Sequence, residues 1–147
     1  MSVLARLMNV VDTLLTGRPP RVIERQFGWL RSMGYRVAES GSRGMELYTT
    51  YASTHVLVRI LEEYHYEFVG VWLARAGIGG GPDVDLKRLL DVRAPAVGWD
   101  GSYSGDGPGA GEAKLAEAAR LLREHCGDIL RGENVEALRA DLIAGDG

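Results

Sequence analysis

The sequence predicts an α+β fold in which a four-stranded antiparallel meander packs with N-terminal and C-terminal helices in two layers. Apolar residues recur every three or four positions near both ends of the chain, as on amphipathic helices. Between residues 45 and 61 the apolar positions alternate with a period of two, as in half-buried strands. Short connections join these segments, which favours hairpins because a parallel crossover needs about a dozen residues or more.

Length and composition indicate one ordered domain. The chain has 147 residues, of which 46% are hydrophobic and 25% are charged. These values are typical of globular proteins and exclude disordered and fibrous classes. We find neither an internal repeat nor a sharp composition boundary, so residues 1–147 are predicted to form a single α+β domain.

Charge and cysteine content restrict the setting in which the protein works. The net charge of −3 gives no overall attraction to nucleic acid or anionic lipid. Arg6 and Asp12 interrupt the apolar N-terminal stretch, which argues against a signal peptide or a membrane span. Cys126 is the single cysteine and cannot form an internal disulfide. We therefore expect a cytoplasmic protein with no membrane or nucleic-acid partner, and the arginine-rich composition suggests a bacterial source.

Two helices are expected before the first strand. Residues 3–15 carry an apolar stripe at helical spacing, and Gly17 follows as a stop. This helix, within residues 1–17, either packs inside the domain or acts as an interaction helix that pairs with another subunit through residues 2–16. Pro19 and Pro20 suit the first turn of a second helix, which Gly34 ends.

The meander is expected to begin at Tyr35, and its second strand follows a turn at residues 41–44. In that strand Leu47, Thr49 and Tyr51 share one face, while Glu46, Tyr48 and Thr50 share the other. The third strand alternates in the same way over residues 55–61. The fourth, over residues 68–73, is apolar on both faces except at Gly70, which is typical of a central strand.

The C-terminal half is expected to hold helices around a loop. Asp83 is a candidate N-cap for a short helix, to which Asp85 adds favourable charge. Residues 98–111 form a glycine-rich segment that we predict to be a flexible loop. A long helix then runs from about Leu115 to Gly132, and Asn134 is a candidate cap for a last helix.

No residue pattern indicates catalysis, a metal site or a cofactor. The glycine run at residues 77–81 has Pro82 where a dinucleotide fingerprint wants its third glycine, and it lacks the lysine of a P-loop. The three histidines have no metal-ligand spacing. Cys126 lies on the apolar stripe of its helix, which predicts a packing role. We predict no catalytic residues, no metal and no cofactor.

The glycine-rich loop supplies the sharpest site hypothesis. It carries the residue types of recognition loops, and its aromatic and acidic members offer an anchor and a rim to a protein partner: Trp99, Asp100, Tyr103 and Asp106. In the alternative interpretation, Trp99 folds back and plugs the open edge of the sheet.

Three further residues are candidates for a partner-binding face of the sheet: Tyr48, His55 and Tyr66. They are amphipathic side chains in or beside predicted strands. The alternative for each is ordinary cross-strand packing, and a register shift of one residue would move them to the other face.

The order of elements carries a resemblance to a known group of proteins. Two helices precede a meander, with Phe27-Gly28-Trp29-Leu30 leading to Gly34-Tyr35, and a helix from Leu115 to Leu130 closes the domain. This order resembles small uncharacterised bacterial α+β proteins, some of which look like immunity proteins of polymorphic toxin systems. The resemblance implies a non-enzymatic role in which the domain binds and blocks a toxin, and it implies no catalytic residue.

These observations predict a non-enzymatic protein-binding module of an immunity-like kind, which occludes a partner protein. One alternative is a homo-oligomeric assembly or scaffold protein that uses the N-terminal amphipathic helix. A second alternative is a small-ligand-binding protein, which would need an apolar pocket with convergent polar groups.

Overall fold

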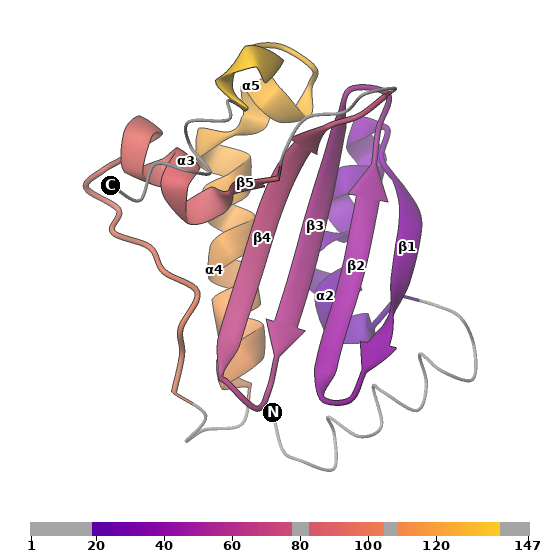
Figure 1. Ribbon diagram of the computed structural model, residues 1–147, viewed down its shortest axis with the longest axis vertical. Coiled ribbons are helices and arrows are strands. Elements are labelled where there is room, and N and C mark those ends of the chain that lie inside the picture. The colour runs from indigo at the N-terminus through magenta and orange to yellow at the C-terminus, as the bar shows by residue number, and fades with distance from the viewer. Residues whose placement is uncertain (1–18, 78–82, 105–108, 139–147) are drawn as a thin grey trace.

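The computed structural model describes residues 19–77, 83–104 and 109–138 (Figure 1). The helix predicted within residues 1–17, most of the glycine run after Gly77, Asp106, and the end of the last predicted helix lie outside the described residues. The elements of the described chain are α2 (Arg21–Phe27), η1 (Gly28–Met33), β1 (Arg36–Arg43), β2 (Glu46–Ala52), β3 (Val56–Glu63), β4 (Phe68–Arg75), β5 (Val84–Asp85), α3 (Leu86–Arg93), α4 (Ala110–His125), α5 (Gly127–Leu130) and η2 (Val135–Ala137).

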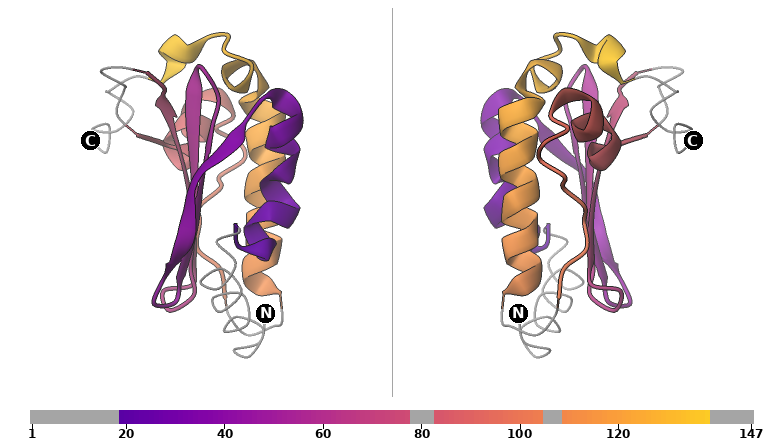
Figure 2. Two further views of the ribbon diagram at one scale, coloured as in Figure 1. Left: turned by 90° about the vertical axis from the view of Figure 1, so that its right-hand side faces the viewer. Right: turned by 90° about the vertical axis from the view of Figure 1, so that its left-hand side faces the viewer.

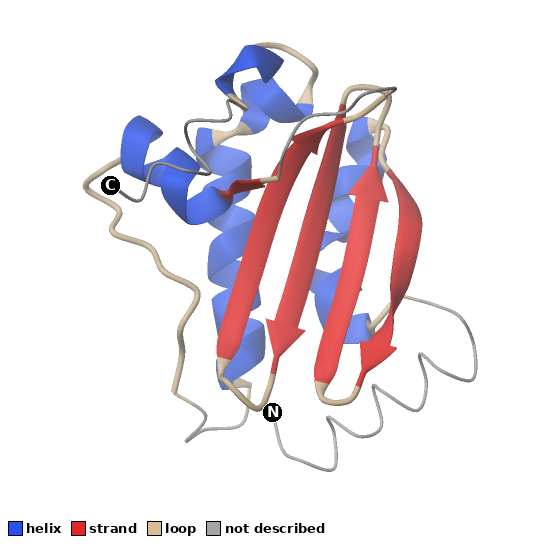
Figure 3. Ribbon diagram, viewed as in Figure 1, coloured by secondary structure: helices blue, strands red, loops and turns tan. Residues whose placement is uncertain are grey.

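The predicted α+β class is confirmed, with an antiparallel sheet in the order β1-β2-β3-β4-β5 (Figure 3). Seen edge-on, α2 and α4 lie together on one side of the sheet (Figure 2). The four long strands are those of the predicted meander. The short β5 was not expected, because two residues are too few to show an alternation.

The core fills the space between α2, α4 and one face of the sheet. The alternation predicted for the second strand is confirmed, because Leu47, Thr49 and Tyr51 are buried and Tyr48 and Thr50 are partly exposed. The third strand follows the same rule, with Val56, Val58 and Ile60 inside. The register places buried residues of neighbouring strands opposite one another, such as Ile60 opposite Val71.

The helix after Pro19 and Pro20 has the bounds that the sequence predicts. Its last part is a 3-10 helix, and Gly34 ends it in the left-handed conformation with φ of 93°. A residue with a Cβ atom rarely adopts this conformation, which explains the glycine. Tyr51 is fully buried and donates a hydrogen bond to Glu24, whose carboxylate also pairs with Arg31 at 2.6 Å. This contact ties the helix to the sheet.

Three local predictions in the C-terminal half were wrong. Asp85, not Asp83, caps α3, because its carboxylate accepts the Lys87 amide at 2.9 Å. The long predicted helix is interrupted at Cys126, whose φ of −125° is not helical, so that α4 and α5 are separate. Asn134 provides no side-chain cap, since its amide donates instead to Asp128 at 2.9 Å.

Candidate functional site: the open face of the sheet

No described element covers the face of the sheet opposite α2 and α4, which we call the open face (Figures 1 and 2). The strand register assigns alternate residues of the strands to it, and Asp83 joins them just before β5: Glu39, Gly41, Arg43, Glu46, Tyr48, Thr50, Leu57, Arg59, Leu61, Glu63, Phe68, Gly70, Trp72 and Asp83. Aromatic, aliphatic and charged side chains therefore share one surface. Of the sequence-predicted site residues, Tyr48 lies on it.

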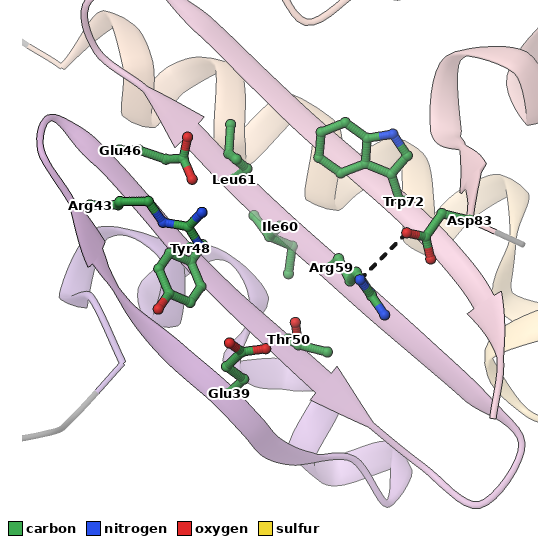
Figure 4. A pocket seen from close by; sticks show the side chains of 10 residues that line it. All are labelled: Glu39, Arg43, Glu46, Tyr48, Thr50, Arg59, Ile60, Leu61, Trp72 and Asp83. Carbon is green, nitrogen blue, oxygen red and sulfur yellow. Dashed lines mark ion pairs between the residues drawn. The ribbon is translucent and has the colours of Figure 1, made fainter. Parts of the chain in front are cut away.

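The centre of the open face is hollowed into a shallow depression of about 320 Å³ (Figure 4). Tyr48 and Trp72 stand on opposite sides of it, and Leu61 lies between them on β3. Charged residues surround these three side chains: Glu39, Arg43, Glu46, Arg59 and Asp83. The depression is open to solvent, unlike the enclosed cavities that bury small ligands.

The Tyr48 ring is held by its neighbours on β1. Gly41 is the cross-strand partner of Tyr48, and a Cβ atom added to Gly41 would lie 2.6 Å from the tyrosine hydroxyl. The ring therefore lies across the glycine. The Arg43 guanidinium lies over the Tyr48 ring, 5.3 Å from the ring centroid, in a cation–π contact. These contacts define the position of Tyr48 before any partner binds.

Trp72 is positioned by a second glycine. A Cβ atom added to Gly70 would lie 2.2 Å from the far edge of the indole, so only glycine leaves room for the ring to lie along β4. Because β4 is apolar at nearly every position, the sequence did not reveal which face Trp72 occupies. Its pairing with Arg59 on β3 places it on the open face.

The charges of the open face are unequally compensated. Arg59 pairs with Asp83 at 3.5 Å, and Arg43 stacks on Tyr48. Within the described chain, the carboxylates of Glu39 and Glu46 have no ion-pair partner within 4.0 Å. The three carboxylates and two guanidinium groups that line the depression give it a net charge of −1.

The aromatic anchor that the sequence predicts at Trp99 in the glycine-rich segment is buried, and residues 105–108 of this segment lie outside the described residues. Trp99 is only 3% exposed and belongs to the core, with the Lys114 ammonium 5.7 Å from its ring centroid. The alternative interpretation, in which Trp99 folds back, fits this position. Residues 98–104 are also attached to β4, through the Val69 amide bonded to Gly101 at 2.8 Å and a bridge between Phe68 and Ser102. These contacts hold residues 98–104 against the sheet, and the predicted flexibility of residues 98–111 stays a prediction.

Tyr103 and Asp100 are likewise engaged within the domain. The Tyr103 hydroxyl donates to the Glu62 carboxylate at 3.3 Å, and Glu62 is 1% exposed. Gly111, in the first turn of α4, lies so close that an added Cβ atom would be 2.2 Å from Glu62 Oε1. The buried carboxylate thus lies at the positive end of the helix dipole. Asp100 is exposed but accepts the Ser102 amide at 2.9 Å.

His55 and Tyr66 do not share one patch. His55 lies in the turn between β2 and β3, where its ring lies against Gly132. Tyr66 lies in the turn between β3 and β4, is 77% exposed, and contacts the His65 ring edge-on. The two turns are at opposite ends of β3. The predicted site residues are therefore dispersed. The sequence analysis missed four residues that line the depression on the open face: Trp72, Leu61, Glu39 and Glu46.

The described ranges contain neither a group of candidate metal ligands nor a membrane-spanning helix. No three His, Cys, Asp or Glu side chains there are grouped so as to hold a metal ion. None of the helices in these ranges has both the length and the apolar character that a membrane crossing requires.

A scan against protein-family models finds no match, and searches of curated proteins and of solved structures find no similar protein.

Proposed function

We propose that the protein is a binding module for another protein, which docks on the open face. The observation that carries this proposal is the asymmetry of the sheet, because described helices cover one face and leave aromatic and aliphatic side chains on the other. A partner that covered Tyr48, Leu61 and Trp72 would remove apolar surface from water. Tryptophan, tyrosine and arginine are also the residues that most often dominate protein interfaces.

The shape of the surface supports a macromolecular partner. A shallow depression in a broad sheet face suits the convex surface of a protein, whereas a small ligand would remain largely exposed there. Tyr48 and Trp72 are held in place by Gly41 and Gly70, so little side-chain freedom is lost on binding. Such preorganisation favours affinity.

The immunity-like role is the more specific form of this proposal. In it, the domain acts in the cytoplasm of the producing bacterium and occludes a toxin that the same cell makes. The buried, unpaired thiol of Cys126 suits a reducing compartment. Protection of cells from a co-expressed toxin, lost with an open-face variant, would support this role.

The binding proposal is tested by capture with matched variants. Tagged protein is used to capture partners from a lysate of its source bacterium, with Trp72→Ala on the open face and Val92→Ala as the control. Val92 is 59% exposed on α3, so both variants remove a side chain from the surface. We expect one stoichiometric partner that the control retains and Trp72→Ala loses, with unchanged circular dichroism. Equal capture by all three proteins would refute the open face as the site.

A further inference from the structure

We propose, on the basis of the proposed function, that the partner inserts a basic side chain, arginine or lysine, into the depression between Tyr48 and Trp72. The partner is thus a protein whose contact segment is cationic. This inference identifies the chemistry of the ligand that the open face recognises.

The depression is lined by charged side chains of both signs. Arg59 pairs with Asp83 at 3.5 Å, whereas Arg43, which stacks on Tyr48, is the cross-strand neighbour of Glu46 and keeps its positive charge in the depression. The carboxylates of Glu39 and Glu46 are without an ion pair in the described chain. The three carboxylates of the lining exceed its two guanidinium groups by one charge, which favours a basic side chain over an acidic one.

The strand register brings two carboxylates together at one end of the open face. Glu46 lies between Arg43 on β1 and Glu63 on β3, and the like charges of Glu46 and Glu63 in directly opposed positions are unfavourable. Glu63 accepts a hydrogen bond from the neutral backbone amide of His65 at 2.9 Å, and this bond does not compensate the carboxylate charge. A cation bound beside Glu46 would relieve this repulsion, so the domain gains more from a basic partner than from a neutral one.

The aromatic walls complete the site. The Arg43 guanidinium already lies 5.3 Å from the centroid of the Tyr48 ring, so Trp72 is the ring that would attract a second cation, and tryptophan attracts cations most strongly. Leu61 lies between the two rings and offers apolar surface to the methylene stem of lysine or arginine. The depression therefore matches both parts of a long basic side chain (Figure 4).

The test uses a random-peptide phage library panned on the full-length protein, followed by anisotropy measurements on labelled copies of the enriched peptides. We expect enrichment of peptides with arginine or lysine beside an apolar residue. Glu39→Gln with Glu46→Gln should weaken their binding about three- to tenfold, as expected for two exposed charge pairs. Glu117→Gln with Glu136→Gln makes the same change in net charge away from the open face and should leave binding unchanged.

A second variant, Arg59→Gln, should change the affinity for basic peptides in the opposite direction. Arg59→Gln frees the Asp83 carboxylate at the edge of the depression, so basic peptides should bind more tightly. Damage to the fold would weaken binding instead, which separates the two explanations.

The outcomes distinguish the inference from the proposed function. Peptides that bind only with Trp72 intact, but are neutral or acidic, would overturn the cationic partner and leave the binding face in place. Basic peptides that bind equally well to the Glu39 and Glu46 variant would do the same. Peptides whose binding ignores Trp72→Ala, or a dimer in light scattering that Trp72→Ala dissociates, would overturn both the heterologous partner and its chemistry.

Discussion

Gly101 shows how a single residue holds the glycine-rich segment against the sheet. A Cβ atom at this position would lie 1.8 Å from the carbonyl oxygen of Val69, which is backbone and cannot rotate away. Gly101→Ala should therefore lower the free energy of unfolding by about 1–3 kcal/mol, the usual cost of overpacking. Urea denaturation of the variant measures this change.

The matched control for that substitution is Gly28→Ala. The nearest atom to an added Cβ there is 3.4 Å away, in the flexible side chain of Glu24, and the backbone φ is −58°. This variant should be neutral or slightly stabilising, since alanine has less freedom in the unfolded chain. Equal destabilisation by both substitutions would contradict the close approach at Gly101.

Cys126 should be chemically silent in the folded protein. Burial is the main cause that raises the pKa of its thiol to about 12, so almost no thiolate exists near neutral pH. We expect a thiol-reactive disulfide reagent at about pH 8 to react only as the protein unfolds. The reaction is followed, with and without denaturant, by the absorbance of the thiolate that the reagent releases. A rapid stoichiometric reaction in native buffer would disprove the burial of Cys126.

At the scale of elements, one ion pair joins α3 to α5. Arg93 forms two hydrogen bonds with the Asp128 carboxylate, at 2.6 and 2.9 Å, and both side chains are mostly buried. Hydrogen bonding from Arg93 is the main cause that lowers the pKa of Asp128. The pair therefore stabilises the fold fully above the ordinary carboxyl pKa, near 4, and the contribution disappears as the pH falls through the lowered value.

Asp128→Asn should reveal that contribution. At about pH 7 the free energy of unfolding should fall by about 1–3 kcal/mol, the value of a hydrogen bond to a charged group. The difference from the parent should shrink at acidic pH, where the parent also loses its carboxylate. Thermal and urea unfolding over a pH series measure both effects. Asp91→Asn, in an exposed pair with Lys87, is the control and should change little.

The sheet elements show which local features the sequence could predict. The buried alternation of β2 and β3 was recognisable, because side chains on a strand alternate between faces whatever lies elsewhere in the chain. The faces of β4 were not recognisable, because its residues are apolar on both sides. Trp72, the central residue of the candidate site, was missed for that reason.

At the scale of the whole molecule, Trp99 and Trp72 report on opposite sides of the sheet. Trp99 is 3% exposed within the core, and Trp72 is partly exposed on the open face. In variants that keep only one of them, the others being replaced by phenylalanine, acrylamide should quench Trp72 and leave Trp99 largely unaffected. Comparable quenching constants would contradict this arrangement of the layers.

The same pair of tryptophans can also report binding. A partner on the open face should protect Trp72 from acrylamide and leave the fluorescence of Trp99 unchanged. Protection that increases at low ionic strength would agree with a cationic partner, because exposed charge pairs are screened by salt. Protection of neither tryptophan by a bound partner would place its site elsewhere.

The amino-acid sequence determined the α+β class, the order of the four long strands after the first described helix, the inner faces of β2 and β3, and the end of that helix at Gly34. These features follow from periodicity and from the conformational preferences of glycine and proline, which act over a few neighbouring residues. The tertiary structure alone decided that Trp99 of the glycine-rich segment is buried, that Glu62 meets Tyr103, and that Tyr48 and Trp72 share the open face. Those outcomes depend on contacts between residues far apart in the chain, and composition, which made the segment look like a recognition loop, contains no information about such contacts.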